Sequence, residues 1–94
     1  MKKITRQVVG AFMRHERCSN GNTWTDGENL YLFGNKIAKW DLNGVWITNC
    51  RWFSSTTKER LNAITGVKIV QKNWVWYLNG KEWDGSWIRI SPNM

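Results

Sequence analysis

The chain has 94 residues, and its 14 lysines and arginines against 7 acidic residues give a formal net charge of +7. A chain this short buries only about 60–65% of its unfolded surface, so its core is thin. No linker or change of composition divides it, and we expect one domain over residues 1–94. The excess positive charge favours polyanions or acidic protein surfaces as partners.

The cysteines and the apolar N-terminal run indicate where the protein acts. Cys18 and Cys50 are too far apart to form a metal-ligand pair and too few for a disulfide framework. The apolar run of residues 8–13 is interrupted by Arg14 and is too short for a signal-peptide core or a membrane span. We therefore expect a cytoplasmic protein with reduced thiols and no membrane association.

Tryptophan is the most unusual feature of the composition, with eight residues. Each indole can bury about 150–250 Å². We expect most of the rings to build the core, and two or three to be partly exposed because so small a domain cannot enclose all of them. The eight are Trp24, Trp40, Trp46, Trp52, Trp74, Trp76, Trp83 and Trp87.

Apolar residues at helical spacing predict a first helix over residues 4–18. Its apolar side holds Ile4, Val8 and Phe12, and the polar residues 19–22 end it. A basic arc faces the other way and is either a phosphate-contacting strip or an ordinary solvated face. The residues of this arc are Lys3, Arg6, Arg14 and Arg17.

Short strands and turn dipeptides follow the first helix. Residues 30–33 and 36–40 are separated by Gly34-Asn35, which suits a type II′ hairpin turn. Asn43-Gly44 then leads into another apolar run over residues 45–48. Residues 30–53 therefore predict a three-stranded meander.

A second helix is predicted from Thr56, where Thr56 and Glu59 have the spacing of a capping box. Gly66 is placed to end this helix. The rest of the chain predicts strands over residues 67–72 and 74–78, and a last strand over 87–90 after further turns.

The predicted order is αβββαβββ, an α+β fold in which an antiparallel sheet of five to six short strands carries two helices on one side. Tyr31-Leu32…Gly34…Trp40-Asp41 resembles Tyr77-Leu78…Gly80…Trp83-Asp84. This similarity suggests two related halves about a pseudo-two-fold axis, although hairpin-rich sequences also produce it by chance.

The sequence offers little chemistry for catalysis. His15 is the only histidine, no cluster of side chains suits a metal, and no glycine-rich loop is suited to holding a phosphate. We expect no enzyme activity, no metal and no cofactor.

The features suited to binding are stronger. Lys68 and Lys72 share one face of a predicted strand, and Trp74 and Trp76 share a face of the next. Those two rings either belong to the core or form a platform for bases, because rings beside lysines on a sheet hold single strands. Tryptophan also anchors protein–protein interfaces.

Several segments together resemble a group of small accessory proteins from tailed bacteriophages. They are Gly21-Asn22-Thr23, residues 30–38, residues 56–62, and Tyr77-Leu78-Asn79-Gly80 with Trp83, Gly85 and Trp87. The resemblance covers nearly the whole chain and implies a protein made inside an infected bacterium. It implies no activity or site residue.

Two functions follow as expectations. The first is non-enzymatic binding of nucleic acid through the basic helix face and a basic, aromatic sheet surface. The alternative is binding to an acidic host protein surface, which would modulate a host enzyme or defence factor. Self-association into a homo-oligomer through strand edges is a further alternative.

Overall fold

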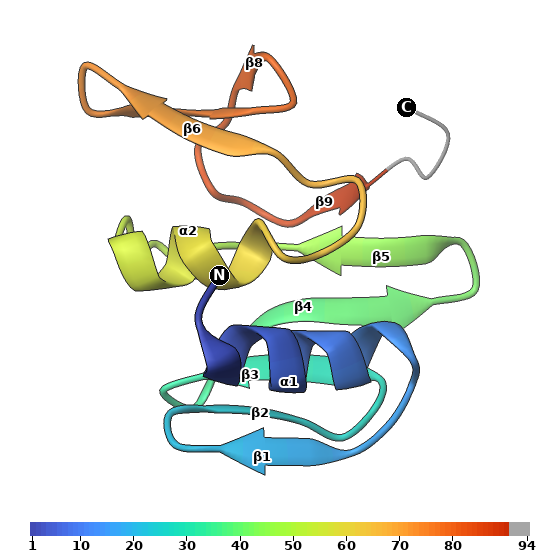
Figure 1. Ribbon diagram of the computed structural model, residues 1–94. Coiled ribbons are helices and arrows are strands. Elements are labelled where there is room, and N and C mark those ends of the chain that lie inside the picture. Colours follow the sequence, from blue (N-terminus) through green and yellow to red (C-terminus); the bar gives the residue numbers. More distant parts are fainter. Residues whose placement is uncertain (91–94) are drawn as a thin grey trace.

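The structure is a computed structural model, and it describes residues 1–90. It has two helices, α1 (Lys3–Met13) and α2 (Ser55–Leu61), with short strands before and after α2 (Figure 1). The strands are β1 (Cys18–Asn20), β2 (Thr23–Thr25), β3 (Asn29–Leu32), β4 (Asn35–Asp41), β5 (Gly44–Ile47), β6 (Ile69–Lys72), β7 (Val75–Leu78), β8 (Lys81–Glu82) and β9 (Ile88–Ile90).

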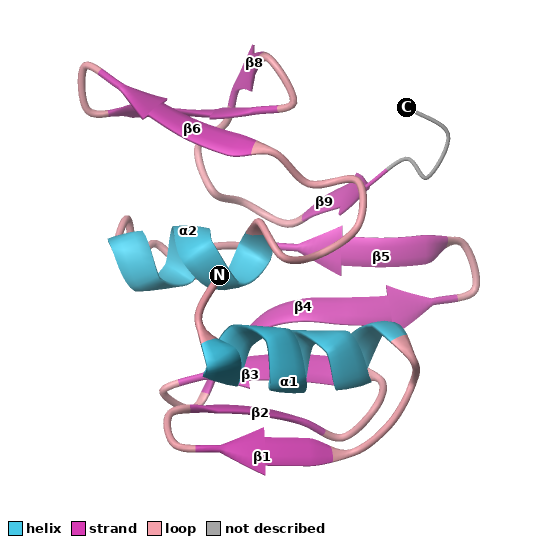
Figure 2. Ribbon diagram, viewed as in Figure 1, coloured by secondary structure: helices cyan, strands magenta, loops and turns pink. Residues whose placement is uncertain are grey.

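The strands form two antiparallel sheets. The larger has the order β1-β2-β3-β4-β5-β9, and the smaller has the order β6-β7-β8. Both helices lie on the same side of the larger sheet, with α1 over its β1–β3 half and α2 beside β4 (Figure 2). The prediction of an α+β fold is confirmed.

The core is one cluster that draws on both sheets and both helices. Phe12 of α1, Ile47 of β5 and Leu61 of α2 are fully buried, as is Trp76 of the small sheet. Burial of Trp76, which can remove roughly 150–250 Å² from water, helps to hold the small sheet to the rest of the protein. Asn62, the C-cap residue of α2, adds hydrogen bonds to the backbone of Ile69 in β6.

A buried arginine ties the two helices to the sheet. Arg60 of α2 is only 2% exposed. Its guanidinium donates to Thr5 Oγ1 of α1 at 2.7 Å and to Thr23 Oγ1 of β2 at 2.9 Å, and it pairs with Glu59. A buried charge needs partners of this kind, because an unpaired one is strongly destabilising.

The first helix is shorter than predicted. It ends at Met13, and His15 adopts a positive φ of 60° that breaks the helical path. Cys18, predicted as the last helical residue, and residues 19–22, predicted to end the helix, belong instead to the β1–β2 hairpin over residues 18–25. The prediction extended the helix past Met13 because the basic residues that follow are compatible with either a helix or a loop.

The second helix also begins differently. Ser54 is its N-cap, and the Ser54 hydroxyl accepts from the Thr57 backbone N–H at 3.1 Å. The predicted capping box of Thr56 and Glu59 is wrong, because the Glu59 carboxylate turns toward Thr5 and Arg60 instead. The helix ends at Leu61, before Gly66.

The predicted meander is present as β3, β4 and β5, but its first turn differs. The two-residue loop is Phe33-Gly34, with φ of 51° and 80°. Positive φ at both positions is the type I′ pattern and not the predicted type II′ turn at Gly34-Asn35.

The two suggested halves are not alike within residues 1–90. Five strands lie between the helices and four follow α2. The last of these, β9, leaves the small sheet and pairs with β5. Nine strands occur in place of the predicted five to six, because very short strands such as β8 carry no recognisable period in the sequence.

Candidate nucleic-acid interface

The tryptophans are more exposed than the sequence suggested. Only Trp76 and Trp83 are buried, while Trp40 and Trp46 are half-buried. The other four are exposed, with fractions of 39% for Trp24, 61% for Trp52, 90% for Trp74 and 39% for Trp87. The expectation that most rings form the core is therefore wrong.

The larger sheet explains part of this exposure, because both helices cover the same face. Thr23, Thr25, Leu30 and Leu32 alternate along β2 and β3 and are buried under α1. The residues between them point to the other face, since successive side chains of a strand alternate. That open face is the candidate interface.

Two rows of side chains cross the open face at right angles to the strands. Residues opposite one another in antiparallel pairing share a face, so the pairing defines each row. The first row is Ser19, Trp24, Tyr31 and Lys36. The second row is Asn29, Lys39, Trp46 and Arg89. We call these two rows together with Trp87 the aromatic–lysine face.

An irregularity in β4 places both lysines on this face. Lys36 and Lys39 are three positions apart and would point to opposite faces of a regular strand. The register shifts between Leu30 and Tyr31 of β3, so that β4 carries one extra residue there. Ile37 and Ala38 are accordingly both buried, and Lys36 and Lys39 face the same way. Such bulges often aim a side chain at a functional surface.

The rings and cations of the two rows touch one another. Trp24 and Tyr31 stack with centroids 4.0 Å apart and an interplanar angle of 10°. Lys36 Nζ lies 6.0 Å from the Tyr31 centroid. Lys39 Nζ lies 4.7 Å from the Trp87 centroid and 5.9 Å from that of Trp46. These contacts fall within the range of cation–π attraction, which holds the lysine heads at the level of the rings.

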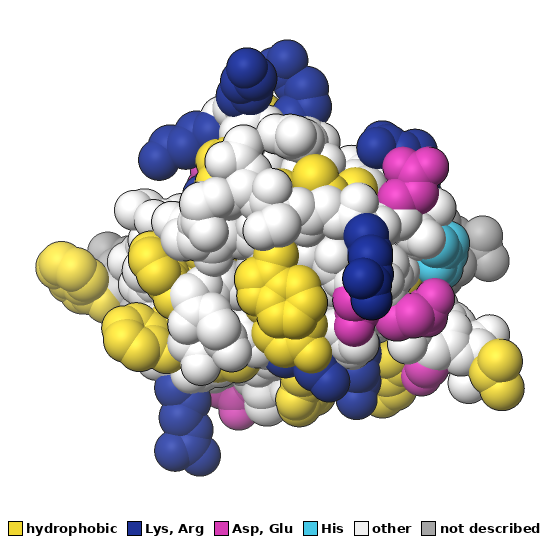
Figure 3. All heavy atoms as spheres, turned by 90° about the horizontal axis from the view of Figure 1, so that it is seen from below, with side chains coloured by type: hydrophobic (Ala, Val, Ile, Leu, Met, Phe, Trp, Pro, Cys, Tyr) yellow, Lys and Arg dark blue, Asp and Glu magenta, His cyan; other side chains and the backbone are white. Residues whose placement is uncertain are grey.

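The charges within the two rows are positive, and one carboxylate borders them, that of Asp41, which accepts a hydrogen bond from Trp46 Nε1. Lys36, Lys39 and Arg89 belong to the rows, which contain no acidic residue. None of the three forms an ion pair with any residue between 1 and 90. On the surface seen in Figure 3, basic side chains are scattered and several stand near acidic ones.

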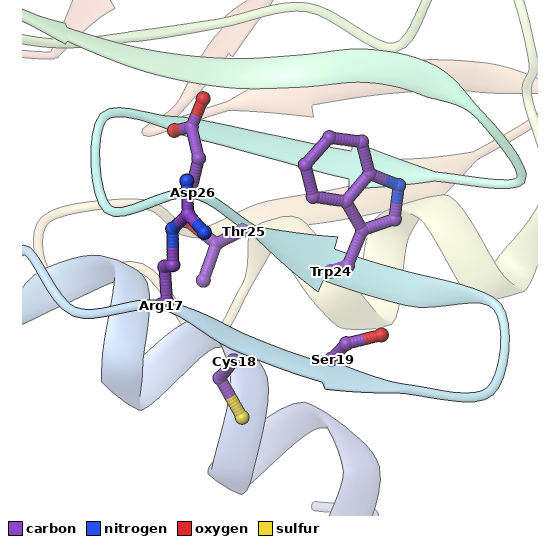
Figure 4. Close-up of a pocket in the computed structure, with 6 residues that line it drawn as sticks. All are labelled: Arg17, Cys18, Ser19, Trp24, Thr25 and Asp26. Atoms are coloured by element: carbon purple, nitrogen blue, oxygen red, sulfur yellow. The ribbon is translucent and has the colours of Figure 1, made fainter.

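Two hollows adjoin the aromatic–lysine face. One of about 380 Å³ is lined by Trp24, Arg17 and Asp26 at the β1–β2 end, where the Cys18 thiol points away toward α1 (Figure 4). Another of about 610 Å³ is lined by Lys36 and Trp87 among others. A hollow thus borders the aromatic–lysine face at either end of its rows.

The acidic groups at these margins are tied into turns. The Glu28 backbone N–H and the Asn29 side chain donate to Asp26 and lower the pKa of its carboxyl. The Ser86 hydroxyl and backbone N–H likewise lower the pKa of Asp84 in the second hollow. Both carboxylates therefore accept hydrogen bonds within their own turns, as in Asx-type turns.

The basic strip predicted on the first helix is only partly present. Lys3 and Arg6 are exposed on α1, but Arg14 is its C-cap residue and pairs with Glu16 at 2.9 Å. Arg17 lies beyond the helix and lines the hollow beside Trp24. The four residues do not share one helix face, and Arg17 extends the aromatic–lysine face instead.

The predicted residues of the second half lie at the other end of the molecule, in and beside the small sheet (Figure 1). Lys68 and Lys72 are exposed. Trp74 stands in the β6–β7 turn, while Trp76 is 1% exposed. The prediction that the two rings share a strand face is wrong, and Trp76 belongs to the core.

The sequence reasoning missed the residues of the aromatic–lysine face. The alternation Thr23-Trp24-Thr25 is a strand signal that could have placed Trp24 on an open face. The pairing of Lys39 with Trp87 depends on the return of β9 to β5, which no local pattern reveals. The omitted residues are Trp24, Tyr31, Lys36, Lys39, Trp46, Trp87 and Arg89.

Other kinds of site find little support in the part of the chain that the structure describes. Cys18 and Cys50 are free thiols, and burial raises the pKa of Cys50, whose Sγ lies 2.8 Å from the Lys36 carbonyl oxygen. No group of three or more potential metal ligands occurs among residues 1–90. Neither described helix is long and apolar enough to cross a bilayer.

Comparison with known proteins places the chain in a family. The model of the family described as Kyanoviridae Gp96 protein matches residues 1–90. The chain belongs to this family. It is thus a phage protein, as the resemblance in the sequence implied. Searches of curated proteins and of solved structures find no significant match.

Proposed function

We propose that this phage protein binds single-stranded nucleic acid on its aromatic–lysine face, as a non-enzymatic accessory protein in the cytoplasm of the infected bacterium. The observation that carries the proposal is the pair of rows, in which aromatic rings stand beside cations without an ion-pair partner on one open sheet face. Aromatic platforms beside basic side chains are the usual means of holding single strands.

The rings supply the first part of the affinity. Trp24 and Trp87 each leave 39% of their surface exposed, enough for a base to stack on the outer side of the indole. Such stacking contributes about 1–3 kcal/mol per base and tolerates any sequence. A duplex hides the faces of its bases, so this geometry favours single strands.

The cations supply the second part. Lys36, Lys39 and Arg89 lie in the rows beside the rings, where the phosphates of a stacked strand would run. Each phosphate neutralised lowers log K by about 0.7 per log unit of salt for a single strand. Three contacts therefore give a slope of about −2.

The test is fluorescence anisotropy with labelled single-stranded DNA and RNA over a range of salt concentrations. The variant Lys36→Ala/Lys39→Ala removes two charges from the face, and Lys3→Ala/Arg6→Ala removes two from α1 as the matched control. We expect affinity to fall strongly for the first pair and little for the second. Absence of binding by the unmodified protein at low salt, or an equal loss for both pairs, contradicts the proposal.

A second candidate function is binding to a host protein, and a specific observation favours it. Phe33, Trp52 and Phe53 are 67%, 61% and 52% exposed. Phe33 and Trp52 line a hollow of about 480 Å³ at the start of α2. Exposed aromatic residues around a pocket are typical of protein-interface anchors.

Affinity purification from host lysate, with and without nuclease, separates the two candidates. A stoichiometric protein that survives nuclease and is lost with Trp52→Ala supports the second. A partner lost only on nuclease treatment supports nucleic-acid binding.

A further inference from the structure

Three hairpins of this protein share one kind of turn. Their two-residue loops are Phe33-Gly34, Asn73-Trp74 and Asn79-Gly80, and both residues of each loop have positive φ. The second position has φ of 80°, 70° and 89°, respectively. Glycine occupies that position in two of the loops, as the type I′ geometry prefers, and tryptophan occupies it in the third.

Folding gives no reason for Trp74. A residue with a Cβ adopts positive φ only at a cost, and a bulky one is a marked outlier. The Trp74 side chain is 90% exposed and makes neither a hydrogen bond nor an aromatic contact with residues 1–90. No packing within the described chain therefore offsets the strain. Strain that the fold does not need is characteristic of functional positions.

One basic residue lies beside Trp74 at the tip of the hairpin. Lys72 stands two positions before it, whereas Lys68 and Lys81 lie at the opposite end of the small sheet, where Ile69 pairs with Leu78 and Leu78 with Lys81. Glu82 is the only acidic residue between positions 66 and 82. None of these lysines forms an ion pair within residues 1–90. Such a tip fits a polyanion better than an apolar protein groove.

We propose that Trp74 is a wedge that inserts between neighbouring bases of the bound nucleic acid, while Lys72 contacts the adjoining phosphate. Apolar side chains act in this way in proteins that unstack base steps. This inference rests on the proposed function for its partner, but it assigns a second contact on a different sheet. A side chain at the tip of a hairpin stands clear of the sheet, which leaves it free to enter a base stack.

The test combines stability and binding in one set of variants. Trp74→Gly restores the preferred turn residue, so its denaturation midpoint should rise or stay unchanged, while affinity for single-stranded oligonucleotides should fall about 5- to 150-fold, the loss of one stacked base. Trp74→Phe keeps both the ring and the strain and should retain most of the affinity. Phe33→Ala removes an exposed ring from an equivalent turn and is the control.

A 2-aminopurine base in the oligonucleotide reports unstacking directly, and its fluorescence should change with the unmodified protein but not with Trp74→Gly. Unchanged affinity and fluorescence for Trp74→Gly, beside a large loss for Lys36→Ala/Lys39→Ala, overturn the wedge and leave the proposed function standing. A large loss for Trp74→Gly beside unchanged affinity for Lys36→Ala/Lys39→Ala supports the wedge and contradicts binding on the aromatic–lysine face. If the unmodified protein binds no oligonucleotide at low salt, both proposals fail.

Discussion

Lys39 of β4 holds its ammonium 4.7 Å from the centre of the Trp87 ring, which lies just before β9. This contact joins the middle of the larger sheet to the segment that returns from the small sheet. It also fixes a positive charge beside an exposed ring. The geometry of the candidate interface therefore depends on the last strand being in place.

Lys39→Met should separate the charge of this residue from its packing, because methionine keeps an apolar stem of similar length. We expect weaker binding to single-stranded oligonucleotides and a salt slope that is smaller by about 0.7. Folding should lose only about 0.5–1 kcal/mol, the value of an exposed cation–π contact. Anisotropy titrations at several salt concentrations and urea denaturation measure the two effects, and an unchanged salt slope would remove Lys39 from the interface.

Arg60→Met should be among the most destabilising changes in the protein. It leaves the hydroxyls of Thr5 and Thr23 without their donor and Glu59 without its counter-charge. Breaking a buried pair in this way costs about 3–5 kcal/mol. Urea denaturation followed by tryptophan fluorescence measures it, with Lys58→Met on the same helix as the control. A loss below about 1 kcal/mol would mean that Arg60 does not hold the helices to the sheet.

Stability should fall in acid, in part because of Glu59. Partial burial raises the pKa of Glu59, but hydrogen bonds from Thr5 and the Lys2 backbone N–H and the charge of Arg60 outweigh it and lower the pKa below its usual value. The unfolded chain then binds a proton more readily than the folded one. The stabilisation is present above the unfolded-state pKa of about 4.3 and is lost as the pH falls through the lower folded value.

Glu59→Gln should therefore flatten the stability curve between about pH 5 and pH 3. The slope that remains should come from other carboxylates, including Asp26 and Asp84, whose pKa values are also lowered. Denaturation midpoints over this pH range test the prediction. Parallel curves for the variant and the unmodified protein would contradict it.

Gly85 and Gly80 offer a matched pair of substitutions. Their φ values are 90° and 89°, so alanine is strained at both. A Cβ on Gly85 would overlap the side-chain amide of Asn49, whereas one on Gly80 would meet nothing within 4 Å. Gly80→Ala should cost about 1–2 kcal/mol from backbone strain alone. Gly85→Ala should cost clearly more, because Asn49 is fully buried and cannot move aside.

Thermal and urea unfolding compare the two glycine variants. Gly85→Ala should also weaken nucleic-acid binding, since Gly85 leads into the segment that places Trp87 against Lys39. Equal stability of the two variants would show that the contact of Gly85 with Asn49 is not required.

The sequence by itself determined the features that depend on neighbours along the chain. The apolar spacing of Val8 and Phe12 predicted α1. Asn43-Gly44 predicted the β4–β5 hairpin, although its two-residue loop is Leu42-Asn43, because Gly44 already pairs with Asp41. The class of fold followed, because the periods of helices and strands are local properties. The excess of positive charge and the resemblance to phage proteins were also readable without a structure.

Only the tertiary structure decided which of these residues face a partner. The bulge that turns Lys36 and Lys39 to one face, the return of β9 to β5 and the placement of both described helices on the opposite sheet face are long-range relationships. The two rings Trp74 and Trp76 show the same limit: one turn residue with positive φ leaves Trp74 in solvent, and packing between the sheets buries Trp76. The solvent exposure of a side chain depends on which residues pack over it in three dimensions, and the spacing of residues along the chain does not determine that.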